Sequence, residues 1–457
     1  MTDRLLVIGA DAAGMSAAHQ ALRTARARGR ELQVVAVETT GHTSYSACGI
    51  PYWIAGDVAG PDRLVARTAT EHRAAGIELR LHHEAVGLDL DGRRCEVRDL
   101  ESGTTRWIGF DQVMIATGAA PVVPDWAIGV ERVHPVKTLD DGATWIRLLA
   151  ENPRTALVVG GGYIGVETAE GLARRGLSTT LVTRGTELMS STLEPGTASA
   201  ARRGLEQLGV RVVCGTRIDG LLTDSGAGVR AVCVDGGEYP ADVLALGLGV
   251  TPRVDLARDA GLPLGGPAVR GALVPDATQQ IIDGVWAAGD CTAVHDRLLG
   301  QPWFVPLGTH AVKCGRVAGT NIGGGRASFP GAVGTAITRA GEVEIARTGL
   351  MPSWASEQLG LRTVTTRLEA TTTSGYMPQA APMAIWVMAQ ADGGRLLGVQ
   401  LSGGPGAAKR IDTAATALTC GLSVEEFAYL DLAYAPPFSP AWDPVQIACR
   451  VLAERGR

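Results

Sequence analysis

The sequence has no closely spaced cysteines, no long apolar run and no large excess of one charge. Its eight cysteines include no Cys-x-x-Cys pair, so we expect neither a metal site nor a fold stabilised by disulfides. A reducing, cytoplasmic setting is the expectation that follows. No stretch is apolar enough to span a bilayer, which argues against a membrane partner. A net charge of −5 gives no reason to expect nucleic acid as a partner.

Aromatic residues are also scarce, at 5%, whereas glycine is abundant, with 60 glycines in 457 residues. Small-residue turns at this frequency are typical of repeated strand–turn–helix units, which favours an α/β fold. The chain is too long for one hydrophobic core, and its length suggests about three domains.

The first strand–turn–helix unit begins close to the N-terminus. An apolar strand, Leu5–Ile8, leads into a turn with Gly9 and Gly14, and the second strand ends at Glu38. Asp11 replaces the middle glycine of a dinucleotide fingerprint, so the turn alone could be an ordinary strand–helix connection. Glu38 favours the cofactor interpretation, because an acidic side chain at that point accepts hydrogen bonds from a ribose. We therefore expect an adenine dinucleotide here.

A second unit carries an intact Gly-x-Gly-x-x-Gly fingerprint between a strand and a helix. In this context the motif cradles a pyrophosphate at the helix N-terminus. The expected cofactor contacts around this loop are Gly160, Gly162, Tyr163, Ile164, Gly165 and Glu167. The next strand ends in Thr183-Arg184, without the acidic residue that accepts a free ribose hydroxyl. Arg184 favours NADPH, although a solvated surface arginine is the alternative and NADH stays open.

Two dinucleotide sites in one chain imply two cofactors, and electron transfer between a flavin and a nicotinamide is the simplest reason for the pair. Further strands end at small-residue turns that we expect to contact these cofactors. The expected contacts are Thr117, Gly118, Gly249, Gly289 and Asp290. The carboxylate of Asp290 suits a ribityl or ribose hydroxyl, whereas without the other motifs a turn-forming aspartate would be the favoured interpretation.

One cysteine, Cys48, lies after the second strand and before a helix start marked by Gly49 and Pro51. Unpaired N–H groups and the helix dipole at such a position favour the thiolate, which would make Cys48 a redox nucleophile. A buried, inert cysteine is the alternative. Residue 53 is tryptophan and the next cysteine is Cys95, so no resolving thiol lies nearby in the chain.

The C-terminal segment, residues 324–457, has no phosphate loop, and we expect it to mediate subunit association. Tyr376 and Tyr434 lie close to prolines, where aromatic packing is the ordinary role. Their hydroxyl groups could also act as proton donors at a site.

The order of these motifs resembles that of the pyridine nucleotide-disulfide oxidoreductase superfamily, specifically its single-cysteine branch. The resemblance covers essentially the whole chain, and its most specific element is Ser44-x3-Cys48-Gly49-Ile50-Pro51-Tyr52. It implies an α/β fold with two Rossmann-like dinucleotide-binding domains, for FAD and NAD(P)H, and a C-terminal α+β dimerisation domain in a homodimer. The implied domains are residues 1–119 and 241–323 for FAD, 120–240 for NAD(P)H and 324–457 for dimerisation.

The branch contains CoA-disulfide reductases, sulfur or persulfide reductases, NADH oxidases and peroxidases. Its oxidases and peroxidases carry a histidine in the first glycine loop, where this chain has Ala12. Ala12 is expected to lie beside the flavin, but it cannot exchange a proton with a peroxide. This departure favours the reductases.

The disulfide reductases of the branch bring tyrosines from the partner subunit toward the cysteine, and Tyr434 and Tyr376 match them. The resemblance also implies substrate contacts, which are Gln20, Arg23 and Ser44, with Ser44 close to the flavin as well. Ala47 departs from the asparagine that commonly precedes the cysteine, which leaves the identity of the disulfide open.

The resulting prediction is an FAD-dependent NAD(P)H:disulfide oxidoreductase. It would reduce a low-molecular-weight organic disulfide, CoA disulfide or a similar compound, through a mixed disulfide on Cys48. One alternative is an NAD(P)H oxidase or peroxidase that cycles Cys48 through sulfenic acid. The others are a persulfide or sulfur reductase and an electron-transfer flavoprotein reductase.

Overall fold

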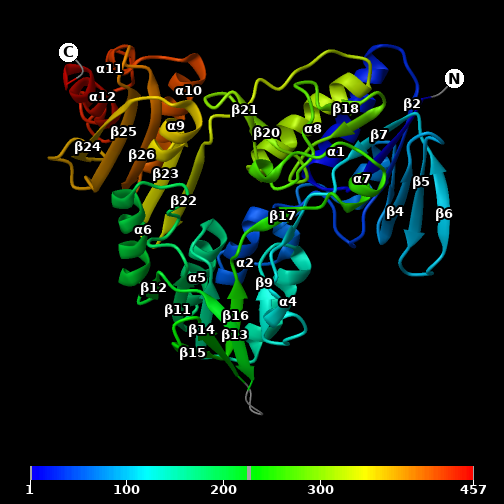
Figure 1. Ribbon diagram of the computed structural model, residues 1–457, viewed down its shortest axis with the longest axis horizontal. Helices are drawn as coiled ribbons and strands as arrows, with labels where there is room; N and C mark the ends of the chain where they lie inside the picture. Colours follow the sequence, from blue (N-terminus) through cyan, green and yellow to red (C-terminus); the bar gives the residue numbers. More distant parts are fainter. Residues whose placement is uncertain (1–2, 224–227, 456–457) are drawn as a thin grey trace.

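The computed structural model describes residues 3–223 and 228–455. Its elements form three units, which Figure 1 shows as an upper-right, a lower and an upper-left lobe. The chain enters the first unit, crosses to the second, returns to the first and ends in the third. Within the described part of the chain, no helix is both long and apolar enough to cross a membrane.

The first unit is built on a six-stranded sheet with the order β18-β19-β7-β1-β2-β3. Its strands are β1 (Asp3–Ile8), β2 (Leu32–Val37), β3 (Ile77–Arg80), β7 (Gln112–Ile115), β18 (Gln280–Ile282) and β19 (Val285–Ala287). β1 runs parallel to β2 and to β7, and α1 (Ala12–Ala27) connects β1 to β2. The carboxyl ends of these strands therefore meet at one edge, where ligands bind in open α/β sheets.

Alternate residues of β1 face opposite sides of this sheet. Leu5 and Val7 belong to the core under α1 and α8 (Gly308–Ile322), while Leu6 and Ile8 pack against a small antiparallel sheet. That sheet consists of β4 (His83–Asp89), β5 (Arg94–Asp99) and β6 (Thr105–Gly109). A Cβ at Gly315 of α8 would lie 2.3 Å from the Ala13 carbonyl oxygen, so glycine lets α8 and α1 cross closely.

The second unit repeats this plan on a five-stranded sheet with the order β12-β11-β10-β16-β9. Its strands are β9 (Val133–Pro135), β10 (Thr155–Val159), β11 (Ser178–Thr183), β12 (Arg211–Cys214) and β16 (Val243–Leu246). Its helices are α4 (Leu139–Ala150), α5 (Tyr163–Arg174) and α6 (Pro195–Gln207). An antiparallel sheet of β13 (Ile218–Thr223), β14 (Val229–Cys233) and β15 (Glu238–Ala241) packs on β10 through Leu157 and Val159.

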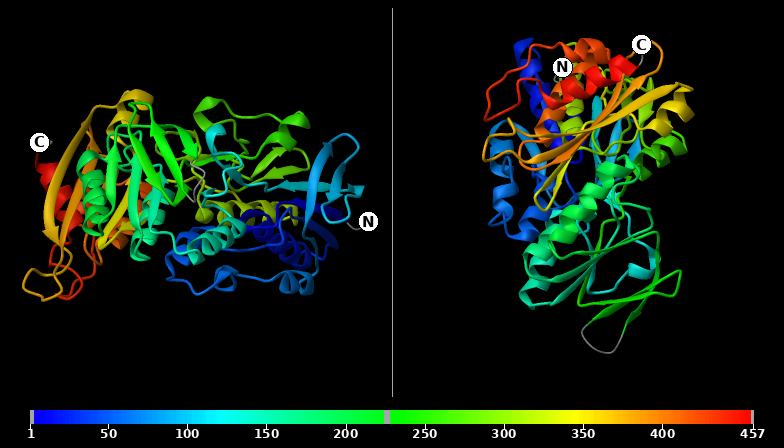
Figure 2. Two further views of the ribbon diagram at one scale, coloured as in Figure 1. Left: turned by 90° about the horizontal axis from the view of Figure 1, so that it is seen from below. Right: turned by 90° about the vertical axis from the view of Figure 1, so that its left-hand side faces the viewer.

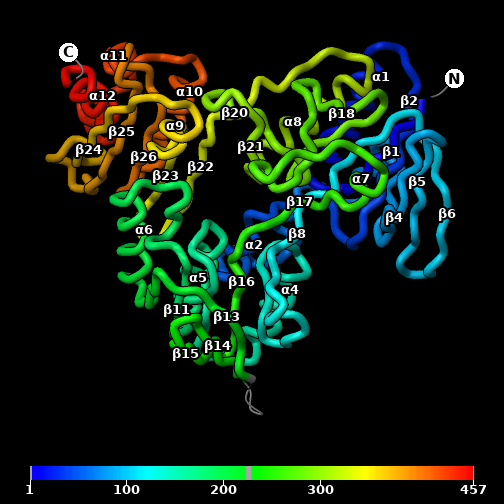
Figure 3. The backbone as a smooth tube through the Cα atoms, viewed as in Figure 1, coloured from blue at the N-terminus to red at the C-terminus, as the bar shows by residue number. Residues whose placement is uncertain are grey.

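Two short antiparallel strands connect the first and second units, β8 (Ala119–Pro121) and β17 (Val250–Pro252) (Figure 3). The sequence predicts that the FAD-binding domain resumes at residue 241. This boundary is wrong by one strand, because β16, which follows residue 241, is hydrogen-bonded between β10 and β9 of the second sheet. Val243 to Leu246 therefore complete the second sheet, and the chain returns to the first unit at β17. From there it continues through α7 (Asp255–Asp259), β20 (Val294–Asp296) and β21 (Gln301–Trp303).

The third unit is a five-stranded antiparallel sheet with the order β22-β23-β26-β25-β24. Its strands are β22 (Ala336–Ala340), β23 (Val343–Gly349), β24 (Thr363–Thr371), β25 (Pro382–Gln390) and β26 (Leu396–Gly403). Its helices are α9 (Pro352–Leu359), α10 (Ile411–Cys420), α11 (Val424–Ala428) and α12 (Pro444–Arg455). The unit is anchored to the second one, where Glu170 of α5 pairs with Arg339 at 3.0 Å and accepts the Gly341 N–H. The α+β class predicted for this segment is confirmed.

Candidate active site

A continuous cleft of about 2920 Å³ lies where the units meet, and both glycine loops open into it. Most residues predicted to bind cofactors line this cleft. They are Gly9, Ala12, Glu38, Ser44, Thr117, Gly118, Gly160, Gly162, Tyr163, Ile164, Glu167, Arg184, Gly249, Gly289 and Asp290. Gly14 and Gly165 are not among the lining residues, because each lies behind its loop, where the helix packs on the strand.

The first glycine loop has the backbone shape that a dinucleotide needs. Gly9 has a φ of +98°, and a Cβ there would lie 2.2 Å from the Ala116 carbonyl oxygen. A Cβ at Gly14 would lie 1.9 Å from the Gly9 carbonyl oxygen. Both glycines are therefore required sterically, and they direct the start of α1 toward the cleft.

Glu38 follows β2 directly and lies at the edge of the cleft. Its carboxylate accepts hydrogen bonds from the N–H of Ala10 at 2.9 Å and of Thr40 at 3.0 Å. These bonds fix its orientation, and a carboxylate has further lone pairs to accept ribose hydroxyls. Its position fits the predicted adenosine contact.

Asp11, which replaces the middle glycine, has a structural role that the sequence did not reveal. Its carboxylate accepts the Tyr45 N–H at 3.1 Å, and the Thr43 hydroxyl donates to the Ala10 carbonyl oxygen. Burial raises the pKa of Asp11 to about 6, partly offset by the Tyr45 N–H. The first glycine loop is thus tied to the segment that carries Cys48.

The second glycine loop provides an open approach for a pyrophosphate. Gly160 has a φ of +117°, and a Cβ there would lie 2.3 Å from the Gly247 carbonyl oxygen. A Cβ at Gly165 would lie 1.9 Å from the Gly160 carbonyl oxygen. At Gly162, by contrast, a Cβ would meet no atom within 4 Å, so this glycine leaves space on the cleft side, at the N-terminus of α5.

Arg184 follows β11, lines the cleft and is exposed. Arg217 lines the same end of the cleft and pairs with Asp219 at 3.2 Å. The nearby Glu187 is occupied by an ion pair with Arg202. The two arginines therefore lie near the end of β11, where the strand ends in Thr183-Arg184 without an acidic residue, and the nearby carboxylates of Glu187 and Asp219 are both in ion pairs.

Cys48 lies in a short 3-10 helix, Ala47–Gly49, which leads into α2 (Ile50–Ala55). Its side chain is exposed to the cleft, so it is not the buried, inert cysteine of the alternative prediction. Crowding by surrounding protein atoms and the negative charge of Glu167 raise the pKa of Cys48, which opposes the stabilisation of the thiolate expected from the helix N-terminus. Lys137 acts in the opposite direction.

Lys137 is the main residue of the site that sequence reasoning missed. Its ammonium group pairs with Asp290 at 3.1 Å, and both side chains are largely buried. Lys137 lies between Val136 and Leu139, which are 4% and 2% exposed. A lysine between buried apolar residues was the available signal, but no motif marks it.

Glu167 lies on α5 and accepts a hydrogen bond from the Thr338 hydroxyl at 2.8 Å. Burial raises the pKa of this carboxyl group. Because Glu167 also raises the pKa of Cys48 and Tyr52, it lies close to both. The residue predicted to contact the nicotinamide cofactor is therefore also an electrostatic neighbour of the thiol.

The structure brings the predicted substrate contacts Gln20, Arg23 and Ser44 to one mouth of the cleft. Arg23 donates to the Gln20 amide oxygen, to which Arg316 of α8 also donates at 2.9 Å. The Ser44 hydroxyl contacts His72 at 2.9 Å. His72, in α3 (Ala69–Ala74), contacts His19 at 2.8 Å, and Arg67 donates to His19. Sequence reasoning missed Arg316, His72, His19 and Arg67, since they come from three helices and a loop that are far apart in the chain.

Tyr376 and Tyr434 do not lie in this cleft. They are 75% and 53% exposed and come from two loops of the third unit, which project from its far end in Figure 2. Within one chain, the structure therefore does not bring either tyrosine to Cys48. Among the described residues, no group of histidine, cysteine and acidic side chains could hold a metal ion.

The fold and the cleft agree with comparisons against known families. A family model described as pyridine nucleotide-disulphide oxidoreductase matches residues 3–313, and the dimerisation domain of that family matches residues 336–445. The chain therefore belongs to the pyridine nucleotide-disulphide oxidoreductase family, and it is an oxidoreductase that uses FAD and NAD(P)H. The predicted family, fold class and cofactors are confirmed.

Individual relatives narrow the class further. The chain is 34% identical over 468 residues to the NAD(P)H coenzyme A polysulfide/persulfide reductase of Pyrococcus horikoshii, covering 99% of each protein. It is 31% identical over 449 residues to the NADH oxidase of Methanocaldococcus jannaschii, covering 97% of each. The structure of an NAD-dependent persulfide reductase from A. fulgidus matches with a TM-score of 0.94 and 31% identity, covering 99% of this chain and 83% of that one. The chain is thus an NAD(P)H-dependent oxidoreductase of the CoA-disulfide reductase, persulfide reductase and NADH oxidase type.

Proposed function

We propose that this protein reduces a low-molecular-weight disulfide, CoA disulfide or a similar compound, with electrons from NAD(P)H and through a mixed disulfide on Cys48. The observation that carries this proposal is the isolation of Cys48 in the cleft. Of the described cysteines, no other lines the cleft. Half of the redox-active disulfide must then come from the substrate.

The proposed reaction begins when the Cys48 thiolate attacks one sulfur of the substrate, R–S–S–R. The substrate S–S bond breaks, one R–S⁻ leaves and is protonated, and Cys48–S–S–R forms. With the cofactors held along the glycine loops at Gly9 and Gly160, two electrons from NAD(P)H would reach this disulfide. These electrons break the mixed disulfide, which restores the Cys48 thiolate and releases a second R–S⁻ that is protonated. The sum is one disulfide, one NAD(P)H and one proton converted to two thiols and NAD(P)⁺.

The chain's own groups are suited to control protons at this sulfur. Burial and Glu167 favour the thiol of Cys48, whereas Lys137 favours the thiolate, so all three influence the fraction that can attack. We further propose that Tyr376 and Tyr434 of a second copy of the chain orient or protonate the leaving sulfur. The match to the dimerisation domain supports such a second copy.

The mouth of the cleft favours a substrate that carries negative charge. Arg23, Arg67 and Arg316 line it together with the polar side chains of Gln20 and Ser44. Guanidinium groups bind phosphates well, so the phosphate groups of a CoA-type thiol fit this mouth. At the other end of the cleft, Arg184 and Arg217 lead us to propose NADPH rather than NADH as the preferred donor.

Persulfide reduction is a second candidate, since the relatives from P. horikoshii and A. fulgidus carry that name. It uses the same nucleophile on the same kind of sulfur bond. Oxygen or peroxide reduction through a Cys48 sulfenic acid has less support, because Ala12 offers no acid–base group at the first glycine loop.

Substrate trials separate these activities. The holoenzyme is offered NADPH or NADH with CoA disulfide, CoA persulfide, other small disulfides or oxygen alone, and thiol release is measured beside oxygen uptake. We expect thiol release with a disulfide, and mass spectrometry should find Cys48 carrying the substrate's thiol. Oxygen uptake that accounts for all NAD(P)H consumed would refute the proposed function, as would full disulfide turnover by Cys48→Ser.

A further inference from the structure

The two loops that carry the exposed tyrosines belong to different parts of the third unit. Tyr376 lies in the loop between β24 and β25, residues 372–381, and Tyr434 lies in the segment before α12, residues 431–443. These loops contain no helix or strand of their own. Contacts other than regular secondary structure must therefore determine how the two tyrosine loops lie relative to one another.

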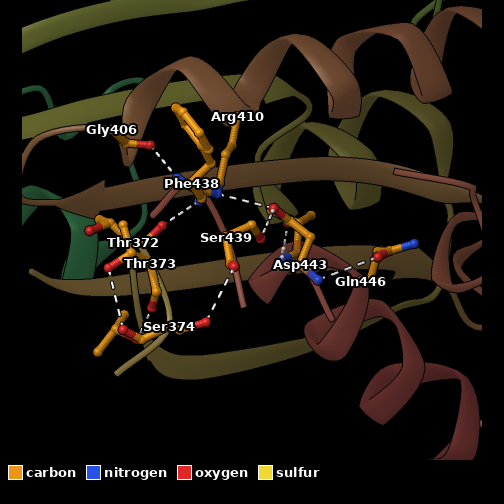
Figure 4. A network of polar contacts seen from close by, with 11 residues as sticks. Thr372, Thr373, Ser374, Gly406, Arg410, Phe438, Ser439, Asp443 and Gln446 are labelled. Atoms are coloured by element: carbon orange, nitrogen blue, oxygen red, sulfur yellow. Dashed lines mark hydrogen bonds and ion pairs between the residues drawn. The ribbon is translucent and has the colours of Figure 1, made fainter. Parts of the chain in front are cut away.

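Arg410, immediately before α10, contacts both loops (Figure 4). Its guanidinium group donates to the carbonyl oxygens of Thr372 on the first loop and of Phe438 on the second, the latter at 2.7 Å. It also donates to the Gly406 carbonyl oxygen and forms an ion pair with Asp443 at 3.0 Å. The Arg410 and Asp443 side chains are only 13% and 14% exposed. One planar fork of donors thus joins both loops to the body of the unit.

Further bonds connect the loops directly. The Ser374 N–H donates to the Pro436 carbonyl oxygen at 3.0 Å. Asp443 is itself fixed, because its second oxygen accepts the Val445 N–H at 2.9 Å. The two loops are therefore bonded to each other, and Arg410 and Asp443 bond them to the start of α10 and of α12.

The location of Arg410 is not explained by the stability of the helix that follows. Arg410 ends the short 3-10 helix Ala408–Arg410, which runs directly into α10, so its positive charge still lies near the N-terminal end of a helical segment, where it is unfavourable. A largely buried ion pair is also weak evidence for a gain in stability, because desolvation opposes the attraction. What Arg410 does provide is geometric specificity at two backbone carbonyls.

We propose that Arg410 and Asp443 are positioning residues. They hold the Tyr376 and Tyr434 loops in one relative position, so that both tyrosines enter the cleft of a second copy together. This inference rests on the proposed function, in which those tyrosines act on the leaving sulfur. The pair does not touch substrate or cofactor. It acts only through the tyrosine loops.

The test compares variants of Arg410 and Asp443 with the unaltered protein, all as dimeric holoenzyme, by their rates of disulfide-dependent thiol release. Arg410→Lys keeps the charge but loses the planar fork, and Asp443→Asn keeps the shape but loses the charge. We expect each to lower disulfide-dependent thiol release about 10- to 100-fold, the scale of a small misplacement at a reacting centre. The rate at which NADPH reduces the bound flavin, with no disulfide present, should stay unchanged, since that step takes place within one chain.

The decisive comparison adds Arg410→Lys to the double variant Tyr376→Phe/Tyr434→Phe. If Arg410 acts through the tyrosines, it should cause no further loss in that background. An equal loss in both backgrounds, or full activity of Arg410→Lys, overturns the proposal. Arg362→Lys is the matched control, because Arg362 pairs with Asp392 at the surface of the same unit and should leave all rates unchanged.

The outcomes also separate this inference from the proposed function. Full disulfide turnover by Tyr376→Phe/Tyr434→Phe would show that the tyrosines have no role, and the Arg410–Asp443 pair would then have no positioning role either. A strong loss of thiol release in the tyrosine variant, with normal rates in Arg410→Lys and Asp443→Asn, would overturn only the positioning role of the Arg410–Asp443 pair. Failure of Cys48→Ser to lose activity would instead refute the proposed mechanism itself.

Discussion

At the scale of single residues, burial and charged neighbours affect the pKa of Cys48 more than the helix that follows it. α2 has six residues, so its dipole is small, and burial with the nearby Glu167 carboxylate dominates. Lys137 opposes them from the other side and is held by Asp290. The thiol is thus poised by a set of charges drawn from three segments of the chain.

Substitution of Lys137 and substitution of Glu167 should shift the pKa of Cys48 in opposite directions. Lys137→Met removes the cation that favours the thiolate, so the pKa of Cys48 should rise. Glu167→Gln removes the anion that disfavours it, so the pKa should fall. The pH dependence of Cys48 alkylation by iodoacetamide measures both shifts.

These variants are best made in a Cys420→Ser background, because Cys420 is also exposed. Shifts in the same direction for Lys137→Met and Glu167→Gln would contradict the assignment of charges around the thiol. An unchanged midpoint in both would show that burial alone determines the pKa of Cys48.

At the scale of an element, the turn between β10 and α5 shows how one fingerprint combines different requirements. Gly160 is needed for a backbone angle and for the approach to Gly247, and Gly165 for the packing of the helix on the strand. Neither steric constraint applies to Gly162, whose lack of a side chain leaves room in the cleft for a ligand close to the backbone. The three glycines should therefore respond differently to substitution.

Gly160→Ala should destabilise the fold, by about 1–3 kcal/mol for the strained backbone alone, because its φ is +117°. Gly162→Ala should leave the unfolding temperature unchanged but raise the KM for NAD(P)H roughly tenfold, equivalent to about 1.4 kcal/mol of lost binding. Thermal unfolding and steady-state kinetics measure the two effects. A Gly162→Ala enzyme with normal KM would argue against pyrophosphate binding at this turn.

At the scale of the whole molecule, the residues that we propose to act on the substrate sulfur do not meet within one chain. Cys48 opens into the cleft, while Tyr376 and Tyr434 project from the far end of the third unit. If the proposed function is right, each active site combines groups from two copies.

Hybrid dimers offer a direct test of that arrangement. Cys48→Ser and Tyr376→Phe/Tyr434→Phe proteins should each be nearly inactive in disulfide reduction. After subunit exchange in equal amounts, about half of the dimers are hybrids with one intact site of two, so about a quarter of wild-type activity should return. No recovery, with hybrids demonstrated by mass spectrometry, would mean that the tyrosines serve their own chain.

The local features of this protein follow from its sequence alone. Glycine spacing after an apolar strand predicts both phosphate loops, because the steric limits at Gly9 and Gly160 belong to the turn itself. The lone Cys48 is equally visible, since its lack of a neighbouring cysteine is a fact about the chain. Even the family could be named from these motifs.

Other features depend on contacts between distant segments, and only the tertiary structure decided them. The return of the chain to the first unit was misplaced because the membership of β16 depends on pairing with β9 and β10. Lys137 and Glu167 are far from Cys48 in sequence, yet together with burial they determine its pKa. Electrostatic and packing effects act through space, so spacing along the chain predicts the loops and the nucleophile but not the charges around it.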